Sequence, residues 1–190
     1  MTKINEQYYR AAQKDPTLRR NFLKEINLGE YRKFTSIIEY VPKQLVEDKR
    51  PALMGQIGPT ILVFPDAFES SPEFFRSGIF EHEMHHAMQD HYHLFRCLLG
   101  RFVPVGKENR AYHTSLTEIP AYHNQIAHIG TGENGRILPQ ECSLLLEGLR
   151  RYTEEMKTIA EKKKRDWKED LSKVLLPSPL DDPVRNFLGL

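Results

Sequence analysis

The residues best suited to chemistry in this chain are two histidines and a glutamate in the segment His82-Glu83-Met84-His85-His86. The segment matches the pattern H-E-x-x-H. Positions i and i+4 of an α-helix share one face, so His82 and His86 can direct ring nitrogens at one metal ion. Zn²⁺ suits such a site, because catalytic zinc binds imidazole and carboxylate groups and keeps one position open for water. Glu83 lies beside the first histidine, where it can act as general base toward that water.

The motif falls inside a predicted helix. Ser71-Pro72-Glu73 has the residues of a helix start, and no proline follows before residue 99. Gly100 predicts the end of this helix. His85 points about 100° away from His86 around the helix axis, so we do not expect it to bind the same ion.

Strands and turns are predicted before this helix. Residues 34–41 and 60–64 are rich in β-branched and aromatic residues, which favour strands. Turns are predicted at the glycines and prolines of this region, Gly55, Gly58, Pro59 and Pro65.

Most of the remaining chain is predicted to be helical. Helices are expected at residues 4–14, 16–27 and 110–129, and at 139–175 as one long helix or two in tandem. Pro120 must start, kink or end a helix where it stands. Three prolines in residues 177–190 predict an extended tail.

Together these elements predict a single α+β domain over residues 1–190, mainly helical, with a small sheet before the H-E-x-x-H helix and a long C-terminal helix. We expect residues 1–57 to hold the N-terminal helices and first strand. Residues 58–130 form the expected metal-binding core, and residues 131–190 the C-terminal helix and tail.

The composition is that of a folded domain and excludes few other classes. The chain has 27 basic and 26 acidic residues, a net charge of +1, and 39% hydrophobic residues. This balance argues against a dedicated nucleic-acid binder, which usually has a strongly basic face. No stretch is long enough to span a membrane, and residues 1–24 lack the apolar core of a signal peptide. We therefore expect a cytoplasmic protein, with signal-less export left open.

The order of a strand, an H-E-x-x-H helix and a downstream helix with a glutamate resembles the zincin metallopeptidases, and within them the gluzincins. The resemblance covers about residues 60–129 and rests on the motif and the order of elements. It implies a zincin-like fold, zinc as cofactor, and hydrolysis of peptide bonds in a peptide or protein substrate. The substrate would lie along the edge strand of the sheet. Residues 58–64 could form that edge, or a core strand.

The resemblance implies a third zinc ligand on the downstream helix, and Glu118 is the best candidate. Ala121 supplies the small residue that lets the two helices approach each other. A capping role for Glu118 is the alternative, because Ser115-x-x-Glu118 matches a capping box. The other candidate ligands on this segment are Glu108, His113, His123 and His128.

Two residues near Glu118 depart from the gluzincin pattern. Tyr122 stands where many gluzincins place an aspartate that orients a histidine ligand, and Pro120 weakens the helix. Asp90, four residues after His86, is a candidate for the orienting role. Hydrolysis also needs a donor to the oxyanion, and Tyr122 or His123 is expected to supply it.

Three other functions remain compatible with these residues. The chain could be a catalytically inactive binding protein built on the same scaffold, or a metal-dependent hydrolase of a non-peptide amide. It could also be a helical interaction protein without metal. The sequence leaves the substrate, cleavage specificity and oligomeric state open.

Overall fold

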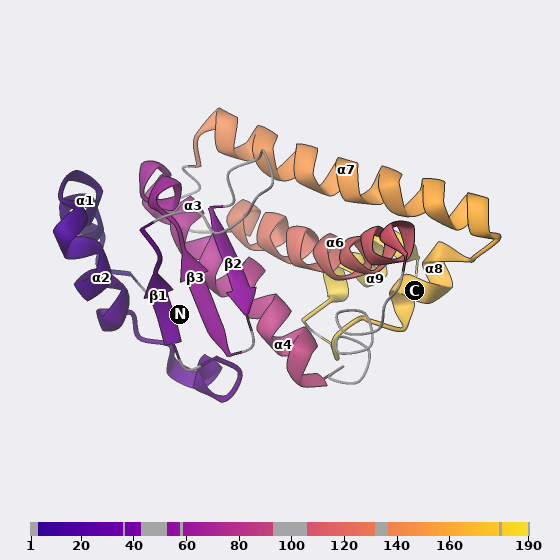
Figure 1. The fold of residues 1–190 in the computed structure, drawn as a ribbon, viewed down its shortest axis with the longest axis horizontal. Coiled ribbons are helices and arrows are strands. Elements are labelled where there is room, and N and C mark those ends of the chain that lie inside the picture. The colour runs from indigo at the N-terminus through magenta and orange to yellow at the C-terminus, as the bar shows by residue number, and fades with distance from the viewer. Residues whose placement is uncertain are drawn as a thin grey trace.

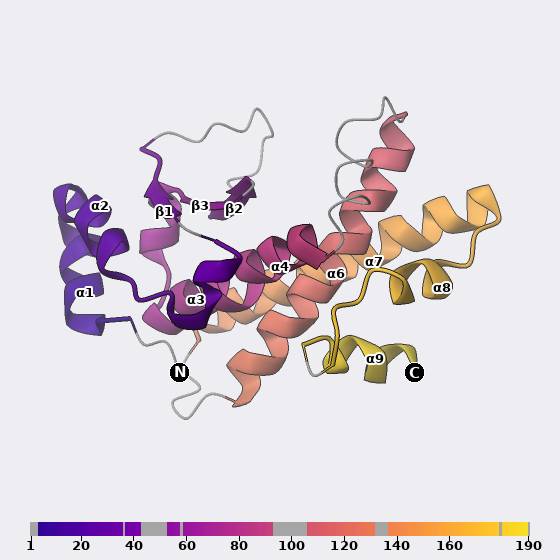
Figure 2. The ribbon, with the colours of Figure 1, turned by 90° about the horizontal axis from the view of Figure 1, so that it is seen from below.

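The architecture is α+β and mainly helical, with one small sheet, as predicted. The computed structural model describes residues 4–35, 37–42, 53–57, 59–92, 106–131, 137–178 and 180–189. In Figure 1 the sheet lies between α1 and α2 on one side and the long helices α6 and α7 on the other, and Figure 2 shows the same order from below. Among these residues, no helix combines the length and apolar composition needed to cross a membrane.

The sheet has three strands in the order β1-β3-β2, namely β1 (Ile37–Tyr40), β3 (Thr60–Val63) and β2 (Met54–Ile57). β1 runs parallel to β3, and β2 antiparallel to it. β3 is central because it pairs with β1 on one side and β2 on the other, so the interpretation of residues 58–64 as an edge strand is wrong. Its residues Ile61 and Val63 are fully buried. The described edges are β1 and β2.

β2 corrects the prediction of a turn at Gly55. Gly55 pairs with Leu62 of β3 in the middle of the strand. Local composition favours a turn at glycine, but here the pairing with a buried neighbouring strand outweighs that preference.

Two short helices begin the chain, α1 (Glu6–Lys14) and α2 (Pro16–Glu25). The predicted cap of α2 is confirmed, because the Asp15 carboxylate accepts a hydrogen bond from the Thr17 backbone N–H at 2.9 Å. The helices bury aromatic rings against the segment after β3. Short 3₁₀ turns, η1 (Gly29–Lys33) and η2 (Pro65–Glu69), flank the sheet.

The metal motif lies on a helix of three consecutive parts: α3 (Pro72–Ser77), the π-helical turn η3 (Gly78–Glu83) and α4 (Met84–Tyr92). Its predicted start is confirmed, since the Ser71 hydroxyl accepts a hydrogen bond from the Phe74 N–H at 3.2 Å. The end predicted at Gly100 lies outside the described residues.

Two 25-residue helices, α6 (Lys107–Thr131) and α7 (Pro139–Lys163), pack along each other. α6 neither begins nor ends at Pro120. The capping role suggested for Glu118 is wrong, because α6 begins at Lys107 and the Ser115 hydroxyl donates to the Ala111 carbonyl within the helix.

The tandem reading of the C-terminal helix is the correct one, and the predicted extended tail is wrong. Lys164 has a positive φ of 53° and ends α7 before α8 (Trp167–Ser172). In the predicted tail, α9 (Asp182–Leu188) forms because proline is tolerated in a first helical turn and Val184 and Leu188 share a buried face.

Candidate metal centre

The first two residues of the motif stand in an unusual turn of helix. His82 and Glu83 lie in η3, where the Met84 N–H donates to the Ile79 carbonyl five residues earlier. A Cβ at Gly78, the first residue of this turn, would lie 3.0 Å from the Met54 sulfur of β2. Glycine therefore lets β2 pack directly against the turn that bears His82.

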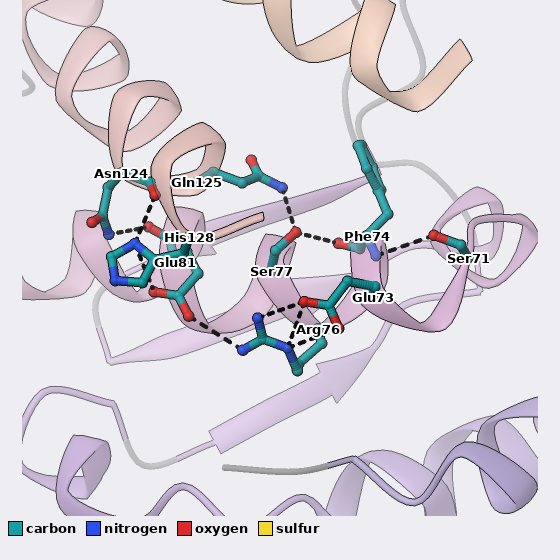
Figure 3. A network of polar contacts seen from close by, with 9 residues as sticks. All are labelled: Ser71, Glu73, Phe74, Arg76, Ser77, Glu81, Asn124, Gln125 and His128. Carbon is teal, nitrogen blue, oxygen red and sulfur yellow. Dashed lines mark hydrogen bonds and ion pairs between the residues drawn. The ribbon is translucent and has the colours of Figure 1, made fainter. Parts of the chain in front are cut away.

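Side chains of α6 hold this turn in place (Figure 3). The Asn124 amide donates to the Glu81 carbonyl at 2.9 Å, and the Gln125 amide donates to the Ser77 hydroxyl at 3.0 Å. All four residues are buried. A π-turn is commonly found at functional sites, and here its backbone is bonded to the same helix that bears Glu118.

A charged network covers the other side of the turn (Figure 3). The Arg76 guanidinium lies 2.8 Å from the Glu73 carboxylate and 3.2 Å from that of Glu81. The Glu81 carboxylate also lies 3.7 Å from Nδ1 of His128, a ring that contacts the Asn124 carbonyl at 2.8 Å. Glu81, the residue directly before His82, therefore pairs with groups that are not among the three predicted metal ligands.

The structure brings together the three predicted ligands. Nε2 of His82 lies 3.4 Å from one Glu118 oxygen, and Nε2 of His86 lies 3.6 Å from the other. One ligand atom from each residue lies within 4.8 Å of the other two. His86 Nε2 is buried and has no hydrogen-bond partner, as a ligand atom facing a metal position would. Two imidazoles and one carboxylate thus fit a zinc site with an open fourth position.

Gln89 orients one of these histidines. Its amide nitrogen donates to the Thr117 carbonyl of α6 at 3.3 Å, which turns its amide oxygen toward His86 Nδ1 at 3.1 Å. A proton of His86 is therefore assigned to Nδ1, which leaves Nε2 as the nitrogen that faces Glu118. Histidine ligands usually have such a partner on the second nitrogen. Gln89 thus makes a contact of the orienting kind, and the same role for Asp90 stays a prediction.

The three ligand candidates also shape one another's protonation. Burial alone would favour the neutral acid, but His86 and His82 outweigh it and hold the pKa of Glu118 below its ordinary value. Burial would lower the pKa of His86, but the Glu118 carboxylate raises that pKa to about 9. In the metal-free protein a proton therefore stays in the group, and a bound cation would replace it.

Glu83 is buried next to this group. Burial raises its pKa, His82 and His86 oppose the rise, and the Glu118 carboxylate adds to it. A carboxylate with a raised pKa is a stronger base than an exposed one. The arrangement therefore suits Glu83 to proton transfer.

Tyr122, one helical turn after Glu118, lines the site between α6 and α7. Its ring meets the His82 ring edge-on, with centroids 4.7 Å apart, and lies 5.9 Å from the Tyr152 ring of α7. Burial and the nearby Glu118 carboxylate raise the pKa of Tyr122, and raise that of Tyr152 to about 12. Both phenols thus stay protonated and can donate hydrogen bonds near Glu118.

His123 contacts α9 and is not a member of the ligand group found among the described residues. Its ring packs 4.9 Å from the Phe187 ring of α9, and burial lowers its pKa. The other alternative ligands also have different neighbours. His113 stacks edge-on with the Tyr112 ring, Glu108 pairs with Lys162, and His128 lies near Glu81.

Two residues of the site escaped the sequence analysis. Gln89 belongs to no sequence motif that indicates an orienting role. It does lie three residues after His86 and therefore on the same helix face. Tyr152 belongs to the apolar stripe of α7, whose periodicity indicates packing rather than proximity to Glu118.

Comparison with known proteins adds no relative: no protein-family model matches the chain, and neither a curated protein nor a solved structure does. The function is therefore inferred from the geometry of the site itself.

The Gln89 contact can be tested by Gln89→Met, which keeps the side-chain volume but removes both hydrogen bonds. We expect zinc affinity to fall about 10- to 100-fold, because His86 loses the partner that fixes its ring. Competition with a chromogenic chelator measures this affinity. Gln13→Met is the matched control. Gln13 lies on α1 and its amide also donates hydrogen bonds to backbone carbonyls, those of Phe68 and Ser70. An unchanged affinity in Gln89→Met would refute the orienting role.

Gly148 tests the packing of Tyr122 against α7. A Cβ at Gly148 would lie 2.6 Å from two ring carbons of Tyr122 and 2.7 Å from its hydroxyl oxygen. We expect Gly148→Ala to lower the free energy of unfolding by about 1–3 kcal/mol, because the ring must move. Urea denaturation measures the change. Gly106→Ala, where nothing lies within 4 Å of the added Cβ, should cost less than about 1 kcal/mol. Equal effects at the two sites would contradict the close packing.

Proposed function

We propose that this protein is a zinc-dependent metallopeptidase of gluzincin type. The observation that supports this best is the convergence of His82, His86 and Glu118, with ligand atoms within 4.8 Å of one another. Two imidazole nitrogens and a carboxylate form the ligand set of catalytic zinc in several peptidases. Glu83 and the oriented His86 add the base and the supporting contact that such a site requires.

The chain's own residues divide the chemistry as follows. When bound by the three ligands, zinc would polarise the scissile carbonyl and make a water more acidic. Glu83 takes the proton of that water, a transfer that its raised pKa favours, and then returns the proton to the leaving amine. The phenol of Tyr122 is the predicted donor to the oxyanion, and Tyr152 is a second candidate on α7. His123 has no part in the proposed mechanism, because its ring packs on Phe187.

The substrate we propose is an extended segment of a peptide or protein. β2 packs against η3, the turn that bears His82 and Glu83. Within the described residues β2 pairs on one side only, with β3. An extended peptide could add to its outer side through main-chain hydrogen bonds. β2 thus replaces residues 58–64 as the proposed substrate strand.

The proposal is tested by Glu83→Gln, which keeps the shape of the side chain and removes the base. We expect this variant to bind about one zinc per chain but to lose about 10²- to 10⁴-fold of its peptidase activity. Zinc content and cleavage of a mixed peptide library, read by mass spectrometry, measure the two effects. Glu69→Gln, an exposed position on η2, should retain both properties.

Three results would contradict the proposal. Peptidase activity that persists in Glu83→Gln would exclude this glutamate as the base. A wild-type protein that binds zinc but cleaves no peptide would point to the inactive binding protein or to a non-peptide amide. A wild-type protein that binds no zinc would exclude the metal centre.

A further inference from the structure

His85, one of the three residues between the ligand positions of the motif, makes a buried contact with the C-terminal segment. Its Nε2 lies 2.6 Å from a carboxylate oxygen of Asp181, and both side chains are fully buried. The second Asp181 oxygen accepts a hydrogen bond from the Leu176 N–H at 2.6 Å. Asp181 therefore joins α4 to the backbone of residues near the end of the chain.

His85 lies on a different face of α4 from the ligands. Consecutive helical residues are about 100° apart, so His86 faces Glu118 while His85 faces Asp181. The helix thus has one face for the metal position and another that is anchored. A rotation of α4 about its axis would disturb both contacts together.

The segment that bears Asp181 is fixed at both of its ends. Leu176 packs in the core cluster of the motif helix, which includes Met84 and Met88. Val184 and Leu188 of α9 pack in the second cluster, with Leu116 and Ile119 of α6 among its members. The Arg185 guanidinium also donates to the Leu176 carbonyl at 2.9 Å.

Asp181 consequently links two elements that must be aligned. It lies between Leu176, in the cluster of α4, and Val184, in the cluster of α6, and α6 bears Glu118. A buried polar pair is costly to desolvate and adds less stability than apolar packing of the same size. Its contribution is a defined position, because the hydrogen bonds form in one orientation only.

We propose that Asp181 is a positioning residue of the metal centre, which by holding His85 fixes the rotation of α4 and so the direction of His86 toward Glu118. This inference rests on the proposed zinc site. It makes the contact of Asp181 with His85 and Leu176 a support of the metal centre that contributes no ligand of its own.

The test is Asp181→Asn in the full chain, with zinc affinity measured by competition with a chromogenic chelator. We expect affinity to fall about 10- to 100-fold, as for other residues that orient ligands. The visible absorption of the cobalt-substituted protein should change as well, because it reports the ligand geometry. Asp182→Asn is the matched control: its carboxylate, at the next position, accepts from Ser178 at 3.3 Å, and both readouts should stay at wild-type values.

If Asp181→Asn does not fold, variants of its partner His85 test the positioning role instead. His85→Gln places an amide N–H where Nε2 stands and should keep zinc affinity within about threefold of wild type. His85→Leu removes the donor and should lose about tenfold or more.

The outcomes separate this inference from the proposed function. The positioning role alone is overturned if the wild-type protein binds zinc and Asp181→Asn leaves both the zinc affinity and the cobalt spectrum unchanged. It is also overturned if the wild-type protein binds zinc and His85→Leu leaves the zinc affinity unchanged. A wild-type protein that binds no zinc overturns both.

Discussion

The packing of the motif helix against α6 holds the candidate ligands together. His82 and His86 come from one of these elements and Glu118 from the other, so the group exists only while the two keep their distance and rotation. Three sets of polar contacts cross or support this contact. The Asn124 amide of α6 donates a hydrogen bond to the π-turn, and the Gln89 amide of α4 donates one to the backbone of α6. Asp181 contacts His85 on another face of α4.

Burial at this contact changes the pKa values of the candidate ligands and of Glu83. Three titratable side chains and the Glu83 carboxylate stand in a largely dehydrated region, where unpaired charges are costly. Their mutual influence lowers the pKa of Glu118 and raises that of His86, which keeps opposite charges beside one another. A divalent cation that bound the same groups would have to displace the proton that the metal-free group holds, so binding would depend on pH.

The sequence predicted the local parts of this arrangement well. The i, i+4 spacing of His82 and His86, the cap at Ser71 and the N-cap at Asp15 are decided within a few residues, and the structure has them as expected. The structure also places Glu118 beside the two histidines, as the sequence analysis expected in preference to a capping role. What could not be read from the pattern depends on distant neighbours: β2 forms because β3 is buried beside it, and α9 forms because Val184 and Leu188 find a core.

The ligand set can be measured by X-ray absorption spectroscopy at the zinc edge, on protein loaded with one equivalent of zinc. We predict one zinc per chain, with two histidine nitrogens at about 2.0–2.1 Å and carboxylate oxygen in the remaining protein position. The Glu118→Ala variant should lose the carboxylate contribution. A centre with three histidine ligands, or a spectrum that Glu118→Ala leaves unchanged, would contradict the account.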